Sequence, residues 1–504
     1  MQYLWVDCLC IVQDDEIPKQ AQIRTMASTF ANAFFTIIAE QGRHANFGLR
    51  GLRGISKARN LSQQAFNFDD GSQAIIRQPF RCWSSATSPK ASLWSKRGWT
   101  SQEDQFSHRR ICFFNDTVRW ECDSAMWCED REITENWHDD FTNKQGYTGR
   151  EVFTDPYPNI GRYNNLVQIY NVKQFTHPED VLEAFLGITS ALSFKFNGGF
   201  LCGLPVMFFD ASLLWQPTNL LRRRTAPKPT PSRLPSWSWA GWHGRVTASY
   251  FQDDFQSYIK QDHFWRPEKH IIHTTPLVDW SYQEKLSLET IQLHSDWYAY
   301  KNSKLGEDNA LPAGWSRHAH FKEDIDWYGD RQSLPSVFYI HVSLPKIGFW
   351  HPIPLCDQSE RPVIRPMGGA LLSCRTRRAW FTLFQTFKSK QGSHFASLHN
   401  DIGTYAGILR LHNKLETMKN PASRTICELV AISKGYTVET YVPESIQLYE
   451  FMIEGGPQKG QRYDFYNVLW VEWEDGIAYR KAIGRIEKNM WESANLEWID
   501  LLLG

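Results

Sequence analysis

The chain opens with a nearly continuous hydrophobic run, YLWVDCLCIV at residues 3–12. Such a run, rich in strand-forming residues, predicts a β-strand buried on both faces of a parallel sheet. QDDEIP, at 13–18, places acids and a proline where a helix begins. That helix repeats apolar residues at helical spacing, namely Ile23, Met26, Ala27, Phe30 and Phe34. FFTIIA, at 34–39, predicts a second strand, so the start of the chain is expected to be a βαβ unit.

The patterns further along the chain predict mostly β-structure. Residues 110–122, RICFFNDTVRWEC, predict a hairpin that turns at Asn115 and Asp116. Residues 181–192 have helical periodicity, with start signals at 177–180. SWSWAGWHG, at 236–244, predicts a strand with Trp237 and Trp239 on one buried face. Further strands are expected at 337–344, 370–376, 406–412 and 425–433, and a hairpin with an Asp475-Gly476 turn at 466–486.

Changes in composition suggest where the chain divides. Residues 222–235, rich in proline and arginine, predict a surface loop or linker with solvated arginines. We therefore expect three regions: an α/β domain with an incomplete parallel sheet at 1–135, a mixed helical middle region at 136–245, and a β-rich, α+β region at 246–504.

Charge and cysteine usage narrow the classes of function. The 504 residues hold 55 Lys plus Arg and 55 Asp plus Glu, so no net charge attracts nucleic acid or an anionic membrane. The 10 cysteines lack the paired CxxC spacing of a zinc site, so we expect buried, reduced thiols and no metal. The sequence has no leader and no apolar run of transmembrane length, which favours the cytoplasm. The 22 Trp, 31 Phe and 19 Tyr suit packed cores and protein partners.

Few residues stand out as candidates for binding or catalysis. Asp14 and Asp15 follow the first predicted strand, at the edge where open α/β sheets bind ligands, although both are also suited to capping the next helix. The motifs of serine hydrolases, zinc proteases and phosphate-binding loops are absent from the sequence. A nucleophilic Cys8 or Cys10 is a further alternative, which the spacing does not favour over buried thiols.

RGWTSQED, at residues 97–104, permits two interpretations of Glu103. Thr100 and Glu103 form the T-x-x-E pattern of a capping box, which is worth about 1 kcal/mol, and Trp99 would then pack back on the helix. Alternatively, the carboxylate performs chemistry as a stabilising anion or nucleophile. In that case, the helix dipole and the capping amides are expected to keep its pKa low.

Several stretches together resemble the fungal HET (heterokaryon incompatibility) family. Within the domain these are LWVDCLCIVQDD, AFFTIIA, FGLRG at 47–51 and RGWTSQED. Beyond it, the similar stretches are THPEDVLEAFLGI, GFLCGLP, LPSWSWAGWHG and NVLWVEWEDGIAYRKAIGRI. Members of the family begin with an upstream strand and helix that do not precede residue 3 here. The resemblance therefore implies an N-terminally shortened HET domain whose parallel sheet is incomplete.

The resemblance implies an effector of programmed cell death in fungal non-self recognition. The family's fold has been likened to TIR domains of innate immunity, some of which cleave NAD with a glutamate in a W-x-x-x-E setting. Trp99 and Glu103 match that spacing, so Glu103 is the candidate catalytic anion, Trp99 shapes the pocket and Arg97 pairs with a phosphate. NAD would be the substrate, and no cofactor is required.

Nicotinamide leaves NAD as a neutral ring, so one carboxylate beside the ribosyl cation suffices for cleavage. Two alternatives remain open. One is a non-enzymatic module that assembles with other incompatibility or signalling proteins, or with itself, through aromatic surfaces. The other is an inactive fragment.

Overall fold

The protein is described by a computed structural model. It covers residues 3–504 with gaps at 43, 61–62, 78–91, 115, 124, 130–149, 226–233, 249–256, 260–271, 285–288, 303–310, 320–336, 350, 357–368, 390–391, 414–424, 439–448 and 459. The chain folds as two compact units. Unit 1 comprises Met1–Glu151 and Val172–Ile188, and unit 2 comprises Val152–Asn171 and Thr189–Gly504. The fold is mixed α/β and rich in strands, as expected in outline, while the boundaries at 135 and 245 stay a prediction.

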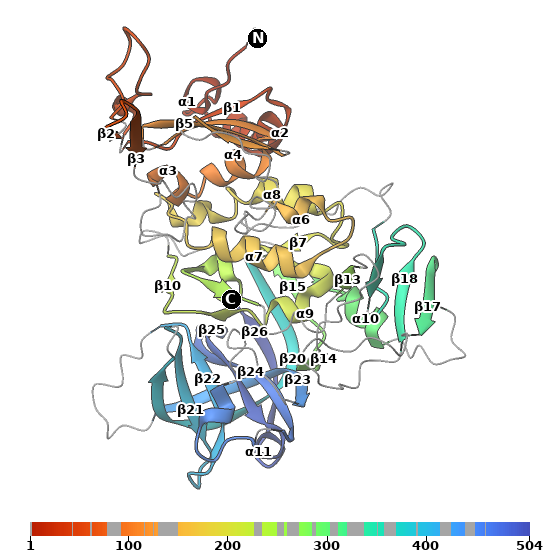
Figure 1. Ribbon diagram of the computed structural model, residues 1–504. Coiled ribbons are helices and arrows are strands. Elements are labelled where there is room, and N and C mark those ends of the chain that lie inside the picture. Colours follow the sequence, from red (N-terminus) through yellow and green to blue (C-terminus); the bar gives the residue numbers. More distant parts are fainter. Residues whose placement is uncertain are drawn as a thin grey trace. The chain divides into compact units, whose positions relative to one another are not determined.

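Unit 1 contains a four-stranded sheet in the order β1-β4-β5-β6. β1 and β5 of this sheet are labelled in Figure 1. β1 runs parallel to β4, with Thr36 opposite Arg110, and the remaining pairs are antiparallel. The elements of its N-terminal part are α1 (Asp7–Cys10), α2 (Glu16–Asn32), β1 (Thr36–Ala39), η1 (Ala45–Phe47), β2 (Gln63–Asn67), β3 (Gln73–Arg77), α3 (Leu93–Lys96), α4 (Thr100–Phe106), β4 (Arg109–Phe114), β5 (Thr117–Cys122) and β6 (Met126–Cys128).

The β4–β5 hairpin confirms the predicted strand pair. Phe114 lies opposite Thr117 in the register, and Asp116 adopts a positive φ of 59°, which short polar side chains tolerate in a turn. Asn115, the other predicted turn residue, lies outside the described residues.

The predicted first strand at residues 3–12 is wrong. Residues 7–10 form the single helical turn α1, in which the backbone N–H of Cys10 donates to the carbonyl of Val6 at 2.8 Å. Tyr3 and Leu9 are exposed, at 91% and 82%, while Ile11 is buried. Residues 3–12 pair with no described strand, so their backbone groups form hydrogen bonds with near neighbours in the sequence. Most of their apolar side chains consequently stay exposed.

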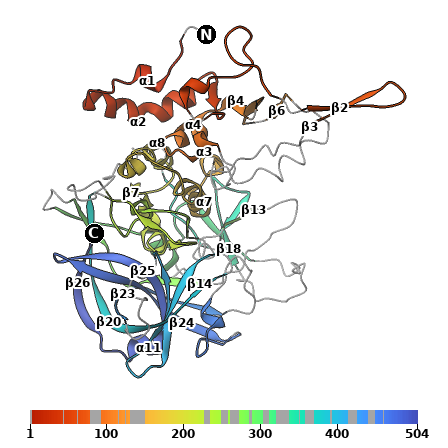
Figure 2. The same cartoon turned by 90° about the vertical axis from the view of Figure 1, so that its left-hand side faces the viewer.

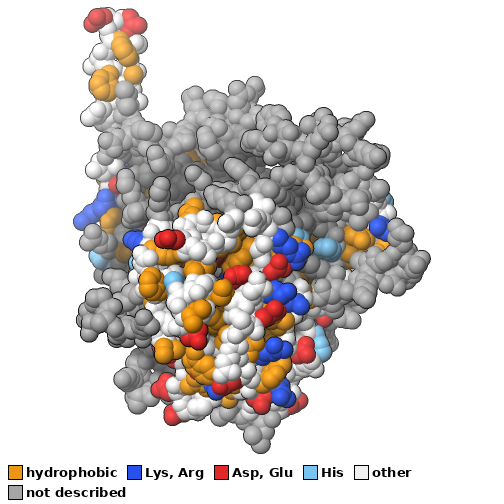
Figure 3. Space-filling view, turned by 90° about the horizontal axis from the view of Figure 1, so that it is seen from below, with side chains coloured by type: hydrophobic (Ala, Val, Ile, Leu, Met, Phe, Trp, Pro, Cys, Tyr) orange, Lys and Arg blue, Asp and Glu red, His pale blue; other side chains and the backbone are white. Residues whose placement is uncertain are grey.

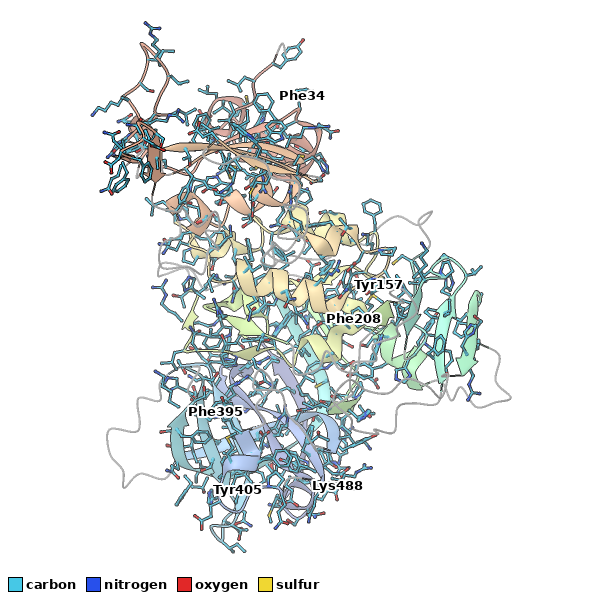
Figure 4. All side chains as sticks on the ribbon, in the orientation of Figure 1. Phe34, Tyr157, Phe208, Phe395, Tyr405 and Lys488 are labelled. Carbon is cyan, nitrogen blue, oxygen red and sulfur yellow. The ribbon has the colours of Figure 1, made fainter. Side chains whose placement is uncertain are left out.

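The predicted helix and second strand are confirmed as α2 and β1. The Asp15 side chain accepts from the backbone N–H of Ile17 at 3.2 Å, so Asp15 caps α2. Phe34, labelled in Figure 4, does not belong to the apolar face of the helix as predicted, because α2 ends at Asn32 and leaves this ring 67% exposed.

The helical core of unit 1 forms on α2. The buried residues of this cluster are Ile11, Ile23, Met26 and Phe30, and Trp5, Trp99 and Phe106 pack against them. Trp5 meets Phe30 edge to face at a centroid distance of 5.4 Å. α1 and α2 consequently lie side by side (Figure 2), and α4 contributes Trp99 and Phe106 to the same cluster.

A second segment of the chain, residues 172–188, completes unit 1. The backbone N–H of Gln174 donates to the carbonyl of Lys96 at 2.7 Å, and that of Gly98 donates to the carbonyl of Gln174 at 2.8 Å. The ring of Phe175 covers Gly98 so closely that an added Cβ would lie 1.9 Å from it. At Gly187, an added Cβ would lie 2.7 Å from the Cβ of Ala27. These two glycines therefore permit close packing that larger residues would block.

The helix predicted at 181–192 is confirmed in part. The chain forms the 3₁₀ turn η2 (Pro178–Val181) and then the α-helix α8 (Leu186–Leu192), with turns between them.

Unit 2 begins with short helices and two-residue strands around a tryptophan-rich segment. These elements are α6 (Glu151–Thr154), α7 (Ile160–Tyr170), β7 (Phe200–Leu201), β8 (Leu204–Pro205), η3 (Val206–Phe208), α9 (Phe209–Ser212), β9 (Gln216–Pro217), β10 (Arg222–Arg223), η4 (Trp239–Gly241), β11 (Trp242–His243) and β12 (Val246–Thr247).

The tryptophan-rich segment is core, as predicted, but it is not a strand over its length. Turns and η4 precede the two-residue strand β11, and Trp237, Trp239 and Trp242 are all buried. The turns leave carbonyls without ladder partners, and side chains satisfy them. The indole N–H of Trp215 donates to the carbonyl of Trp237 at 2.8 Å, and that of Trp242 to the carbonyl of Ser236 at 2.8 Å.

The expectation of solvated arginines in 222–235 is wrong for Arg224. This side chain is 4% exposed and donates to the carbonyl of Trp242 at 2.6 Å and to Oδ1 of Asn171 at 2.7 Å. Arg223 similarly donates to the carbonyls of Gly241 and Leu234. Both arginines serve the buried carbonyls of the tryptophan-rich segment. Residues 226–233 of the predicted linker lie outside the described residues.

Most of the remaining chain of unit 2 forms one large sheet. Its strands are β14 (Ile272–Pro276), β15 (Ser281–Glu284), β16 (Thr290–Gln292), β20 (Ala370–Lys388), β21 (His394–His399), β22 (Tyr405–Leu411), β23 (Thr425–Val438), β24 (Arg462–Glu474), β25 (Ile477–Glu487) and β26 (Glu497–Leu503). β20 pairs with both β21 and β23, so β20-β21-β22-β25-β24-β23 closes into an antiparallel barrel (Figure 1). Phe395 on β21 and Tyr405 on β22 mark one wall (Figure 4).

The predicted strands of the β-rich region are confirmed, and β20 and β23 extend well beyond them. The hairpin turn at Asp475-Gly476 is also confirmed, with positive φ angles of 50° and 78° at the two residues. A separate sheet holds β13 (Ser257–Ile259), β17 (Trp315–Ala319), β18 (Val337–His341) and β19 (Ile347–Phe349). The remaining described elements are α10 (Asp296–Asn302), η7 (Tyr449–Met452) and α11 (Lys488–Glu492).

Substitution of Gly98 tests the packing of residues 172–188. We expect Gly98→Ala to lower the free energy of unfolding by about 1–3 kcal/mol, because the new methyl group collides with the Phe175 ring. Denaturant titration measures the change. Phe175→Leu in the same chain should recover part of the loss, and a Gly98→Ala variant as stable as the wild type would contradict the packing.

Candidate functional site

The candidate site surrounds Glu103 in the first turn of α4, within unit 1. The indole N–H of Trp94, on α3, donates to Oε2 of Glu103 at 2.9 Å. Ser92 caps α3 by accepting from the backbone N–H of Ser95 at 3.1 Å, which fixes the short helix that presents Trp94. Glu103 is partly buried and is held by a side chain from the preceding helix.

The predicted capping box is wrong. Trp99, not Thr100, is the N-cap residue of α4, and no side chain makes a cap hydrogen bond there. The Thr100 hydroxyl donates instead to the carbonyls of Trp94 at 2.7 Å and Arg97 at 2.8 Å. Because Trp94 belongs to α3 and Arg97 is its C-cap residue, the threonine ties the two helices together. The Glu103 carboxylate is therefore not engaged in capping its own helix.

The expectation of a lowered pKa for Glu103 is also wrong. Burial raises the pKa of this carboxyl, and the nearby negative charge of Asp7 raises it further. The hydrogen bond from Trp94 and the positive charges of Arg97 and Lys173 oppose the rise. Loss of water around the group outweighs these favourable contacts, so Glu103 holds a proton more readily than an exposed glutamate.

Trp99 and Arg97 take different positions around this carboxylate. The indole N–H of Trp99 donates to Oδ2 of Asp180, on η2, at 3.2 Å, while its ring packs on the α2 cluster. Trp99 thus joins α4 to the segment 172–188. Arg97 is exposed, and its backbone forms a parallel bridge with Gln174.

Lys173 is a functional candidate that the sequence did not indicate. It is only 5% exposed, and burial lowers its pKa while the charges of Asp104 and Glu103 oppose that effect. Its neighbour Gln174 pairs with 96–98, which places Lys173 beside both acids. A lysine seventy residues from the motif carries no local pattern, so only the tertiary fold reveals it. Trp94 was missed as well, since a spacing of nine residues matches neither a helix nor a strand.

Asp104 begins a chain of paired charges that crosses one face of the sheet. Arg110 binds both Asp104 and Glu121, the latter at 2.5 Å. Arg119 binds Glu121 and lies 3.6 Å from Oε1 of Glu40. Burial would raise the pKa of Asp104, but Arg110 in particular holds it below its usual value. Positive and negative groups therefore alternate from Lys173 to the end of β1.

Glu40, the last residue in this series of paired charges, is buried and has a raised pKa. It is 6% exposed, and its Oε2 has no hydrogen-bond partner among the described residues. Burial raises its pKa to about 7, with Arg119 opposing and Glu121 adding to the rise.

Asp14 and Asp15, the predicted ligand-binding acids, lie apart from this geometry. Asp14 is exposed, and Asp15 caps α2. Because α1 replaces the predicted strand, these acids do not follow a strand end.

The prediction that the cysteines are buried is wrong for Cys8 and Cys10, which are exposed. It is correct for Cys112, Cys128, Cys202, Cys374 and Cys427.

Two small cavities lie in unit 2, and Glu103 of unit 1 lines neither of them. One lies between α7 and β12, beside Trp215 and Trp239, and the other lies beside Arg410 and Arg485 on β22 and β25. Within the described ranges, no group of three or more His, Cys, Asp or Glu side chains is arranged to hold a metal ion. In the same ranges, no helix is long and apolar enough to cross a membrane.

Residues 1–103 match the family described as heterokaryon incompatibility protein (HET). The protein therefore carries a HET domain in its N-terminal part, as the resemblance implied. The match ends at Glu103, although the fold that surrounds this residue includes β4–β6 and residues 172–188. No curated protein matches the chain, and no solved structure matches it.

The state of Glu40 can be tested through the pH dependence of stability. A raised pKa in the folded state means that its contribution is complete below the unfolded value of 4.5 and is lost as the pH rises through about 7. Relative to Glu40→Gln, the wild type should lose on the order of 1–3 kcal/mol of stability between about pH 5 and about pH 8. Denaturant titrations at both pH values measure this loss. Asp69→Asn, at an exposed position, serves as control, and parallel curves for wild type and Glu40→Gln would contradict the assignment.

Proposed function

We propose that this HET-domain protein is a cytoplasmic effector of programmed cell death in fungal non-self recognition. We further propose that it acts by cleaving NAD or a related nucleotide at the bond to ribose, in the manner of TIR-like enzymes. Glu103 is the key carboxylate, Trp99 shapes the pocket and Arg97 binds a phosphate. The HET match supports the biological role, since heterokaryon incompatibility is the process for which the family is named.

The observation that carries the enzymatic part is the hydrogen bond from Trp94 to Glu103. A side chain from another helix holds this carboxylate, and the capping role that would explain a glutamate here is not in use. Perturbed carboxyl groups of this kind are concentrated at active sites, although ion-pair networks also contain them.

The surrounding charges suit a nucleotide. Arg97 is exposed beside Glu103 and supplies a guanidinium for a phosphate, while Trp94 offers a flat ring next to the carboxylate. The bond to be broken joins a ring nitrogen to C1 of ribose, and a carboxylate stabilises the positive charge that develops on the sugar.

Assembly with partner proteins is the second candidate function, favoured by exposed aromatic side chains. In the large sheet of unit 2, β20, β24 and β26 expose Trp380, Trp473 and Trp498, at 40%, 38% and 58%. The guanidinium of Arg377 lies 4.8 Å from the ring centroid of Trp498. Exposed tryptophan and arginine side chains are enriched at protein interfaces. Figure 3 shows hydrophobic side chains between charged ones on the barrel surface seen from below.

Substitution of Glu103 separates the two functions. Glu103→Gln keeps the acceptor for Trp94 but removes the charge, so NAD loss and cell killing should fall about 100-fold while thermal stability stays within a few degrees. The full chain is expressed in a fungal host, and NAD and viability are followed together. The exposed Glu474→Gln serves as control.

Killing that survives Glu103→Gln while NAD stays constant would contradict the enzymatic proposal and favour assembly. In that case, Trp498→Ala and Trp380→Ala should reduce killing. A large loss of thermal stability in Glu103→Gln would instead assign the residue a structural role.

A further inference from the structure

The cavity beside β22 and β25 in unit 2 is lined by charged side chains that are themselves buried. Arg410, Arg485 and Glu450 are 5%, 6% and 3% exposed, and all three line the cavity. Its volume is about 30 Å³. A buried water needs roughly 10–15 Å³, so the cavity has room for more than one water or for a small oxyanion. Because buried charges are costly unless something pairs with them, this cavity is a candidate binding site.

The register of the sheet brings the two arginines together. Arg410 on β22 lies opposite Ile483 on β25. Arg485 on β25 lies opposite Ile408 on β22, so the two arginines are diagonal neighbours on one face of the sheet. Phe395, labelled in Figure 4, lies opposite Arg410 on β21, and its ring centroid is 4.9 Å from the Arg410 guanidinium. Two like charges on neighbouring positions of one face repel each other unless an opposite charge lies between them.

Neighbouring segments of unit 2 hold the two guanidinium groups. Nη1 of Arg410 donates to Oε1 of Gln216, on β9, at 2.7 Å. Nη1 of Arg485 donates to Oε1 of Glu450, on η7, at 2.5 Å. Nε of the same Arg485 guanidinium is buried and has no hydrogen-bond partner among the described residues. A buried donor without a partner costs stability, so this N–H at the cavity points to a ligand that accepts from it.

The lining favours an anion as that ligand. Its residues include two arginines and a single acid, so basic side chains outnumber acidic ones. Nε and one terminal nitrogen of an arginine form a fork that binds the oxygens of a phosphate or a carboxylate through two parallel hydrogen bonds. A phosphate presents oxygens in several directions and therefore suits two arginines better than a flat carboxylate does.

We propose that this cavity binds a phosphate group between Arg410 and Arg485, and that Gln216 and Glu450 hold the two arginines in position. The bound anion balances the excess of positive charge in the lining and accepts from Nε of Arg485. Because the lining residues all belong to unit 2, this site does not include Glu103 and is independent of the proposed enzymatic function.

The full chain is titrated with inorganic phosphate at constant ionic strength, and binding is followed by calorimetry and by the melting temperature. We expect saturable binding and a melting temperature that rises with phosphate concentration, because a ligand of the folded state stabilises it. Arg410→Gln should weaken binding about 10–100-fold, since it removes charge-assisted hydrogen bonds. Arg462→Gln, at an exposed position of the same sheet, is the matched control and should bind phosphate within about twofold of the wild type.

Two further variants guard against misfolding and against binding elsewhere. Arg410→Lys keeps the charge but loses the fork, so its affinity should lie between those of the wild type and Arg410→Gln. Arg97→Gln removes the phosphate contact proposed in unit 1 and should leave this binding unchanged. Loss of binding in Arg97→Gln would place the phosphate in unit 1 and overturn the inference. Equal affinities of Arg410→Gln and Arg462→Gln, or the absence of saturable binding to the wild type, would overturn it as well.

Two more titrations identify the source of the phosphate group. Glycerol 3-phosphate that binds at least as tightly as inorganic phosphate, and loses affinity in Arg410→Gln, would support a phosphate ester as the ligand. Binding of inorganic phosphate alone would support the free ion. Acetate that binds more tightly than both would overturn the assignment to phosphate.

Discussion

A short parallel pairing of backbone, in which Gln174 bonds with Lys96 and Gly98, is the constraint on which the candidate site depends. It places Phe175 over Gly98 and Lys173 beside Glu103 and Asp104. The hydrogen bond from Trp99 to Asp180 is a further link between α4 and residues 172–188. The HET match ends at residue 103, yet the carboxylate at that position owes part of its environment to residues 172–188. The matched residues 1–103 are thus only part of unit 1.

Buried charge is the second theme of the molecule, and it is compensated in two ways, by opposite charges and by backbone carbonyls. In unit 1, acids and bases alternate from Lys173 through Asp104, Arg110, Glu121 and Arg119 to Glu40, so each charge has an opposite neighbour. In unit 2, Arg480 is fully buried and donates to the carbonyls of Leu213 and Trp215, with no carboxylate paired to it among the described residues. Burial alone lowers its pKa. Backbone carbonyls thus solvate this arginine, as they do Arg224.

Local patterns predicted those elements whose stability is decided nearby in the chain. The helix α2 followed from its apolar spacing and the cap at Asp15, and the β24–β25 hairpin from Asp475-Gly476. The tryptophans of 236–244 were correctly assigned to the core, but their alternation predicted a strand where η4 and turns form. Arginine and indole donors from elsewhere satisfy those carbonyls, which removes the need for a neighbouring strand. The strand predicted at 3–12 is absent for a related reason. A strand requires a hydrogen-bonded partner strand, whereas the backbone of α1 forms its hydrogen bonds within the helical turn.

The sequence by itself determined the HET domain, the αβ character of its start, the β-rich remainder and Glu103 as the residue of interest, because each is written in contiguous residues. Only the tertiary structure decided what surrounds Glu103. The Trp94 indole donates to its carboxylate, and the charges of Asp7 and Lys173 act on it from other segments. Burial then raises its pKa where a helix N-terminus alone would lower it. The balance between desolvation and charge is set by distances through space, which spacing along a chain does not encode.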